Sequence, residues 1–194
     1  MAQQKKRGRL VLVLIALIFL VPLLAAVWLQ RVVSREGVWG TTNHGTLIQP
    51  PLALKDFRLP SLEGPEFTLD KLRGKWTLLY VAPSVAECDQ QCLQMVYYMR
   101  QIRLSLNQDM TRVQRVLLAA PEAAWLPNIA KEYEGMHILY DTGSPASLRE
   151  QLNPVQPGIY MIDPMANAMM IFPPDTDPRD ILKDIKRLLK ISQG

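Results

Sequence analysis

The pattern of hydrophobic and polar residues separates a short apolar segment near the start of the chain from a longer region of alternating strand and helix patterns. Residues 10–29 contain no charged side chain. Twenty apolar residues are about enough to cross the hydrocarbon core of a bilayer. The pattern therefore predicts one transmembrane helix over residues 10–29, after a basic tail over residues 1–9. A cleaved signal peptide is the alternative, but its apolar core is usually shorter than this run.

The rest of the chain is predicted to hold a linker over residues 30–54 and one α/β domain over residues 55–194. The linker is rich in glycine, threonine and proline and shows little periodicity. In the domain, short apolar runs alternate with helical spacing, which predicts βαβ units, a mostly parallel sheet and a final antiparallel hairpin. The strands are expected at Trp76–Val81, Arg115–Ala119, His137–Tyr140, Gly158–Ile162 and Ala168–Phe172. The helices are expected at Cys92 to about Asn107, at Glu122–Tyr133 with an interruption near Pro127, at Ser144–Leu152 and at Pro178–Ile191, the last capped by Asp177.

The charge distribution bears on topology rather than on nucleic-acid binding. The net charge is +4, but six of the 22 Lys and Arg residues lie within the first 35 residues. From Gly37 onward, 16 basic residues face 17 acidic ones, so the domain carries no basic excess for nucleic acid. Four basic residues precede the predicted span and two follow it, which places the N-terminus in the cytoplasm. In a bacterial cell, the chain would cross the inner membrane once and its C-terminal domain would be periplasmic.

The two cysteines, Cys88 and Cys92, carry most of the chemical information. They follow the buried strand Trp76–Val81 after a short loop and stand where a helix is expected to begin. Thiols at such a place are typical of thioredoxin-like folds. Three interpretations remain open: a structural disulfide, a redox-active pair, and a pair of thiolates that binds Cu(I). A structural zinc site is disfavoured because it needs four ligands. The acidic neighbours Glu87 and Asp89 oppose the helix dipole, which favours a reductant or metal carrier over a disulfide donor.

Three features together resemble the Sco/SenC family of membrane-anchored, thioredoxin-fold proteins. They are the N-terminal span, the opening Phe67-x-Leu69-x-x-Leu72-x-Gly74-Lys75-Trp76, and the C-x3-C spacing of Cys88 and Cys92. The resemblance covers roughly residues 55–190. It implies that both thiolates and a distant histidine bind copper, and that the protein helps to assemble the copper centre of cytochrome c oxidase. The implied partner is a respiratory oxidase subunit or another thiol or copper protein.

The chain departs from the Sco/SenC pattern near its penultimate strand. Counting back from Tyr160, the position of the ligand histidine is occupied by Val155. The segment around Pro157 instead resembles TlpA/ResA-like thiol reductases, in which a cis proline lies opposite the reactive thiols. Pro157 is therefore a candidate catalytic residue together with Cys88 and Cys92. This resemblance implies an alternative function, that of a metal-free thiol-disulfide oxidoreductase, and a non-catalytic interaction module is a second alternative.

Four other residues carry side chains that could bind copper. His137 is expected in or beside a strand in a structural role, and it is the candidate third copper ligand if the loop before Pro157 supplies none. His44 is expected to be a solvated residue of the linker. Met95 and Met99 share a helical face with Cys92, and such a stripe more often packs in a core than binds Cu(I).

Overall fold

The computed structural model describes residues 17–28, 43–83, 87–121, 123–141, 147–152 and 155–192. Residues 17–28 are helical, and no helix within the described residues is both long enough and apolar enough to cross a membrane. The predicted basic tail, residues 1–9, and the remaining residues of the predicted span lie outside this description. Residues up to Thr42 and residues from Asn43 onward form two separate units.

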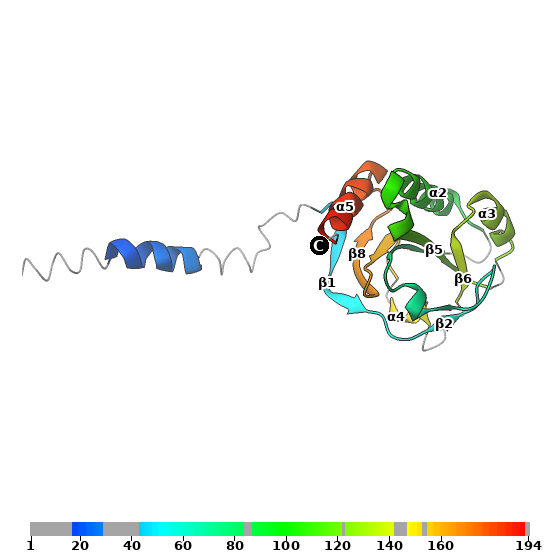
Figure 1. Cartoon of the computed structure of the whole chain (residues 1–194), viewed down its shortest axis with the longest axis horizontal. Helices are drawn as coiled ribbons and strands as arrows, with labels where there is room; N and C mark the ends of the chain where they lie inside the picture. The colour runs from blue at the N-terminus through cyan, green and yellow to red at the C-terminus, as the bar shows by residue number, and fades with distance from the viewer. Residues whose placement is uncertain are drawn as a thin grey trace, which may run out of the picture. The chain divides into compact units, whose positions relative to one another are not determined.

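The unit from Asn43 onward is built on a six-stranded sheet with the order β1-β8-β7-β4-β5-β6 (Figure 1). Strands β4, β5 and β6 are parallel, whereas the pairings β4–β7, β7–β8 and β1–β8 are antiparallel. The predicted antiparallel hairpin is confirmed, but a mostly parallel sheet is wrong because that hairpin and β1 complete the sheet beyond β4. The strands span Thr46–Ala53 (β1), Trp76–Val81 (β4), Val113–Ala119 (β5), His137–Tyr140 (β6), Ile159–Ile162 (β7) and Asn167–Phe172 (β8).

Two different layers cover the faces of the sheet. One face packs against α2, α3 and α5, and its core includes Cys92, Met99 and Ile185. The other packs against α4, the short helix η1 and the hairpin β2–β3, and its core includes Phe67 and Leu148. The remaining elements span Arg58–Leu59 (β2), Phe67–Thr68 (β3), Leu69–Lys71 (η1), Gln90–Leu104 (α2), Asn107–Arg112 (η2), Leu126–Glu132 (α3), Leu148–Gln151 (α4) and Pro178–Ile191 (α5).

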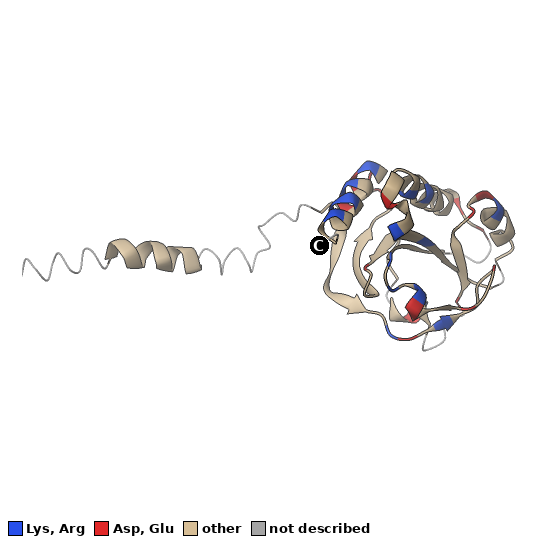
Figure 2. Cartoon of the chain, viewed as in Figure 1, with Lys and Arg blue, Asp and Glu red and all other residues tan. Residues whose placement is uncertain are grey.

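The local sequence explains where the main elements begin and end. Every residue of β4 and β5 is buried, as expected for central strands covered on both faces. Helix α5 begins after Asp177, as predicted, and the Asp177 side chain accepts a hydrogen bond from the Arg179 N–H at 2.8 Å. Helix α3 is shorter than predicted because Pro127 stands in its first turn, where a missing N–H is tolerated. Charged side chains gather along α5, whereas α2 is mostly uncharged (Figure 2).

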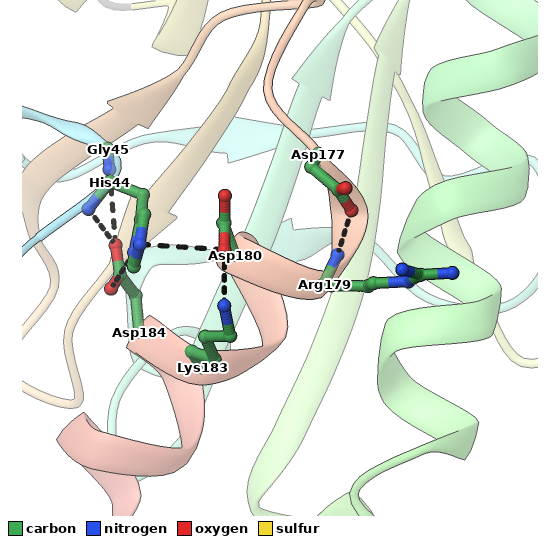
Figure 3. Close-up of polar contacts among 7 residues, drawn as sticks. All are labelled: His44, Gly45, Asp177, Arg179, Asp180, Lys183 and Asp184. Carbon is green, nitrogen blue, oxygen red and sulfur yellow. Dashed lines mark hydrogen bonds and ion pairs between the residues drawn. The ribbon is translucent and has the colours of Figure 1, made fainter.

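The predicted linker is wrong for its last residues, because Thr46–Ala53 form the edge strand β1 beside β8. His44, expected to be a solvated linker residue, is bound to α5 (Figure 3). Its ring Nδ1 lies 3.0 Å from Asp184 Oδ1, and its Nε2 lies 3.5 Å from Asp180 Oδ1. Asp184 Oδ2 also accepts the backbone N–H groups of His44 at 2.7 Å and of Gly45 at 3.1 Å. We call these contacts of residues 44–45 with Asp184 the N-terminal clamp.

Candidate functional site

Cys88 and Cys92 are joined by a disulfide at the start of α2. Their Cα atoms are 5.1 Å apart, within the usual range for a disulfide. Cys88 precedes the N-cap residue Asp89, and Cys92 lies in the first turn, so the bond forms without unwinding the helix. The Asp89 carboxylate accepts a hydrogen bond from the Cys92 N–H at 2.8 Å. Cys92 is fully buried and Cys88 is half-buried, so Cys88 is the more exposed of the two residues.

A basic residue, Arg149, lies at the carboxyl end of β4, where the chain leaves the sheet toward the cysteines. The Arg149 guanidinium donates a hydrogen bond to the Ala82 carbonyl at 3.2 Å, across 67 positions of sequence. The Arg149 backbone N–H donates to the buried Asp141 carboxylate at 2.8 Å. Sequence reasoning missed Arg149 because no basic residue adjoins the cysteines in the chain. The one available signal was its place after strand β6, since functional groups gather beyond the carboxyl ends of parallel strands.

A buried tyrosine lies under the cap of α2. Tyr80 is in β4, and burial together with the negative charge of Asp89 raises the pKa of its phenol to about 12. The phenol therefore stays protonated throughout the physiological pH range.

The loop that contains Pro157 reaches the same end of the sheet as the cysteines. Ile159 pairs with Tyr80 in antiparallel register, so the residues just before Ile159 lie level with the end of β4. Gly158 has a φ of +136°, and a Cβ there would collide with the Phe172 carbonyl. The only cis peptide bond in the described residues is Gln49–Pro50, so the bond before Pro157 is trans, unlike the TlpA-type element. Val155 packs against the core on the face opposite α2.

The structure does not bring His137 to the cysteines. His137 pairs with Val116, three residues before the end of β5 and therefore roughly 10 Å along the strand from that end. Its ring packs on Phe67, with centroids 5.1 Å apart, on the face opposite α2. Burial of part of the ring, followed by the charges of Lys71, Lys75 and Arg115, lowers the pKa of His137.

The other proposed sulfur ligands are part of the core. Met95 and Met99 are 1% and 0% exposed and share a cluster with Cys92, which confirms their packing role. Within the described residues, no group of three or more His, Cys, Asp or Glu side chains is arranged to hold a metal ion. The arrangement therefore provides a disulfide and, once reduced, two thiols.

Comparisons with known proteins agree with this architecture. ScoI of Bradyrhizobium japonicum with copper bound matches at 20% identity, over 70% of this chain and 98% of that one, with a TM-score of 0.54. Yeast Sco1 with copper bound matches at 17% identity, over 72% and 90%, with a TM-score of 0.57. BsSco, a member of the Sco family of cytochrome c oxidase assembly proteins, matches at 18% identity, over 73% and 96%, with a TM-score of 0.54.

At these identities the likeness shows the fold alone, and the predicted resemblance to Sco/SenC proteins and the thioredoxin-like fold are confirmed at that level. A search of curated proteins found no match. A family model described as "Transmembrane-like, thioredoxin-like, C-terminal domain" matches residues 76–192, more than half of the chain. The chain therefore belongs to the family of transmembrane-like, thioredoxin-like C-terminal domains.

Proposed function

We propose that this protein is a Sco-like, membrane-anchored assembly factor for a respiratory copper enzyme, cytochrome c oxidase. Cys88 and Cys92 act either as carriers of Cu(I) or as a dithiol that reduces a disulfide of the partner and so keeps the partner's cysteines as thiols. The observation that carries the proposal is the disulfide at the start of α2, with one half-buried and one fully buried cysteine, in a fold shared with Sco proteins. In this proposal residues 10–29 anchor the chain in a bacterial inner membrane and the domain lies in the periplasm.

The thiol reaction uses the difference in exposure between the two sulfurs. A partner thiolate attacks Cys88 Sγ, the Cys88–Cys92 bond breaks, and Cys92 leaves as a thiolate that takes a proton from solvent. A second thiolate of the partner then attacks the partner's own sulfur in the mixed disulfide and releases Cys88. The sum is one protein disulfide reduced and one partner disulfide formed, and the reverse sequence reduces the partner. Pro157, at the same end of the sheet, is proposed to contact the incoming chain.

The copper reaction treats Cu(I) as cargo. The reduced pair supplies two soft thiolates, the ligand type that selects Cu(I). Val155 has no nitrogen in its side chain. His137 lies on the face of the sheet opposite α2, so it adds no nitrogen ligand to the thiols in the described arrangement. We therefore expect the reduced chain to bind about one Cu(I) through sulfur alone and to hold Cu(II) poorly, because Cu(II) prefers sites rich in nitrogen and oxygen.

An anaerobic titration of the reduced, full-length chain with Cu(I) against a competing chelator tests this function. We expect uptake by the wild type and none by the double variant Cys88→Ser, Cys92→Ser. In cells, deletion should lower oxidase activity under copper limitation, and the double variant should fail to restore it. Normal oxidase activity after deletion would remove the assembly function, and full complementation by the double variant would leave only an interaction module.

The second candidate function is that of a metal-free thiol-disulfide oxidoreductase, similar to TlpA/ResA proteins. It is favoured by the two-thiol donor set, which lacks a third ligand within the described residues. Titration of the disulfide with dithiothreitol, read by alkylation and mass spectrometry, measures its potential. Reduction without Cys-dependent Cu(I) uptake would favour this candidate, whereas a potential below about −300 mV would indicate an inert structural disulfide.

A further inference from the structure

An exposed apolar ridge follows the disulfide along α2. Leu93, directly after Cys92, is 42% exposed, and Tyr97, one turn further, is 48% exposed. Core positions of the same helix, such as Val96 and Met99, face the sheet, so α2 presents apolar side chains both inward and outward. The outer face of the helix near the disulfide is also without charge until Arg100. Leu93 and Tyr97 thus form an apolar surface beside Cys88, which we call the α2 ridge.

A groove runs beside the α2 ridge. Its volume is about 670 Å³, and it lies between α2 and the segment that leads into α5. Within it, Gln94 Nε2 donates a hydrogen bond to the Tyr98 hydroxyl at 2.6 Å. The Tyr98 ring lies 6.2 Å from the Tyr97 ring, which joins the groove to the ridge. The lining residues are Gln94, Tyr98 and the segment 174–179.

The charges around this surface have mostly one sign. Glu87 and Asp89 flank Cys88, and Asp175 and Asp177 are exposed on the rim of the groove, whereas the basic side chains are Arg179 on the rim and the exposed Arg100, three residues after Tyr97. Such a rim attracts a basic partner and repels an acidic one. Leu93 follows Cys92 directly, and Glu87 and Asp89 adjoin Cys88 in the chain, so a partner bound at the start of α2 meets both the apolar side chain and the carboxylates. The ridge and groove therefore lie on the helix that carries the disulfide.

We propose that the α2 ridge and its groove dock the protein partner of thiol exchange, and that this partner's cysteine is flanked by apolar and basic residues. The inference rests on the proposed thiol function and adds to it the chemistry that selects the partner. The apolar flank of the partner packs on Leu93 and Tyr97. Its basic flank faces the carboxylates of Asp175 and Asp177.

The test uses the oxidised full-length chain in detergent micelles and two synthetic peptides of matched length. Both have a central cysteine, flanked by Leu and Lys in one and by Ser and Glu in the other. The rate of reduction of the Cys88–Cys92 disulfide is measured by acid quench and mass spectrometry. Each rate is divided by the same peptide's rate with bis(2-hydroxyethyl) disulfide, an uncharged reference, which removes the effect of the flanks on thiolate content. We expect the Leu/Lys peptide to be about tenfold faster at low salt, with the advantage shrinking as salt rises.

Variants locate the docking surface. Leu93→Ser and Tyr97→Ser should each slow the Leu/Lys peptide several-fold, while Leu104→Ser should not. Leu104 is 48% exposed on the same helix but roughly 16 Å further along its axis, so it is a matched control. Asp175→Asn should reduce the advantage of the basic peptide. Asp70→Asn should not, because Asp70 lies in η1, before the opposite end of β4.

The rate with dithiothreitol separates docking from reactivity. All the variants should match the wild type with this small uncharged reductant, which also shows that they are folded. Equal normalised rates for the two peptides, or equal effects of Leu93→Ser and Leu104→Ser, would overturn the docking surface while leaving the thiol function intact. A wild-type disulfide that dithiothreitol cannot reduce would instead overturn the thiol function itself.

Discussion

The N-terminal clamp makes a quantitative prediction about Asp184. This carboxylate is 3% exposed and accepts the backbone N–H groups of His44 and Gly45 as well as the His44 ring (Figure 3). Replacing it in Asp184→Ala leaves two backbone donors without an acceptor. An unsatisfied buried donor costs about 1–3 kcal/mol, and the His44 N–H is only partly buried. We therefore expect Asp184→Ala to lower the free energy of unfolding by about 2–4 kcal/mol.

Two milder variants separate the backbone contacts from the ring contact. Asp184→Asn keeps one acceptor oxygen for the backbone N–H groups and should cost about 1 kcal/mol. His44→Ala removes only the ring, which is 40% exposed, and leaves both N–H groups bonded, so its cost should also be about 1 kcal/mol or less. Asp180→Asn on the same helix tests the weaker ring contact, since this half-buried side chain lies 3.5 Å from His44 Nε2 and also pairs with the exposed Lys183, so its cost should be the smallest.

The assay is urea unfolding of the full chain in detergent, followed by far-UV circular dichroism. The loss in free energy of unfolding should be largest for Asp184→Ala, smaller for Asp184→Asn and His44→Ala, and smallest for Asp180→Asn. A free energy of unfolding for Asp184→Ala within about 0.5 kcal/mol of the wild-type value, or no lower than that of His44→Ala, would show that the backbone contacts of the clamp do not stabilise the fold.

Two further predictions concern His137, an exposed residue whose ring packs on Phe67, and the buried Arg115. The lowered pKa of His137 means that the unfolded chain takes up a proton first, so stability is fully present above about pH 7 and is lost as pH falls through about 6.5. The wild type should lose slightly more stability than His137→Gln between about pH 7.5 and pH 5.5, and parallel curves would contradict the shift. Arg115 is 3% exposed, its Nε and Nη1 have no partner among the described residues, and burial beside other arginines lowers its pKa to about 10. Arg115→Met should therefore be neutral or stabilising by about 1 kcal/mol in urea unfolding, and a clear loss of stability would show that the guanidinium is better paired than its contacts indicate.

The sequence by itself determined the elements whose signal is local. The continuous apolar run Trp76–Val81 predicted a buried central strand, because burial on both faces leaves no polar alternation. The spacing of Ile181, Ile185 and Leu189 after Asp177 predicted α5 and its start. The C-x3-C spacing placed both thiols at one helix start, which is compatible with the observed disulfide but left a metal-binding pair open as well.

Only the tertiary structure decided which distant residues meet. The segment Thr46–Ala53, with Pro50 and Pro51, has no strand periodicity, and it becomes a strand because β8 offers an unpaired edge. Arg149 reaches Ala82 and His44 reaches Asp184 because the sheet order brings their elements together, whereas the alternation of side chains along β6 leaves His137 on the far face from Cys92. Periodicity reports how neighbouring residues are buried. It does not report the order of strands, which depends on the packing of the whole core and decides the surroundings of the thiols.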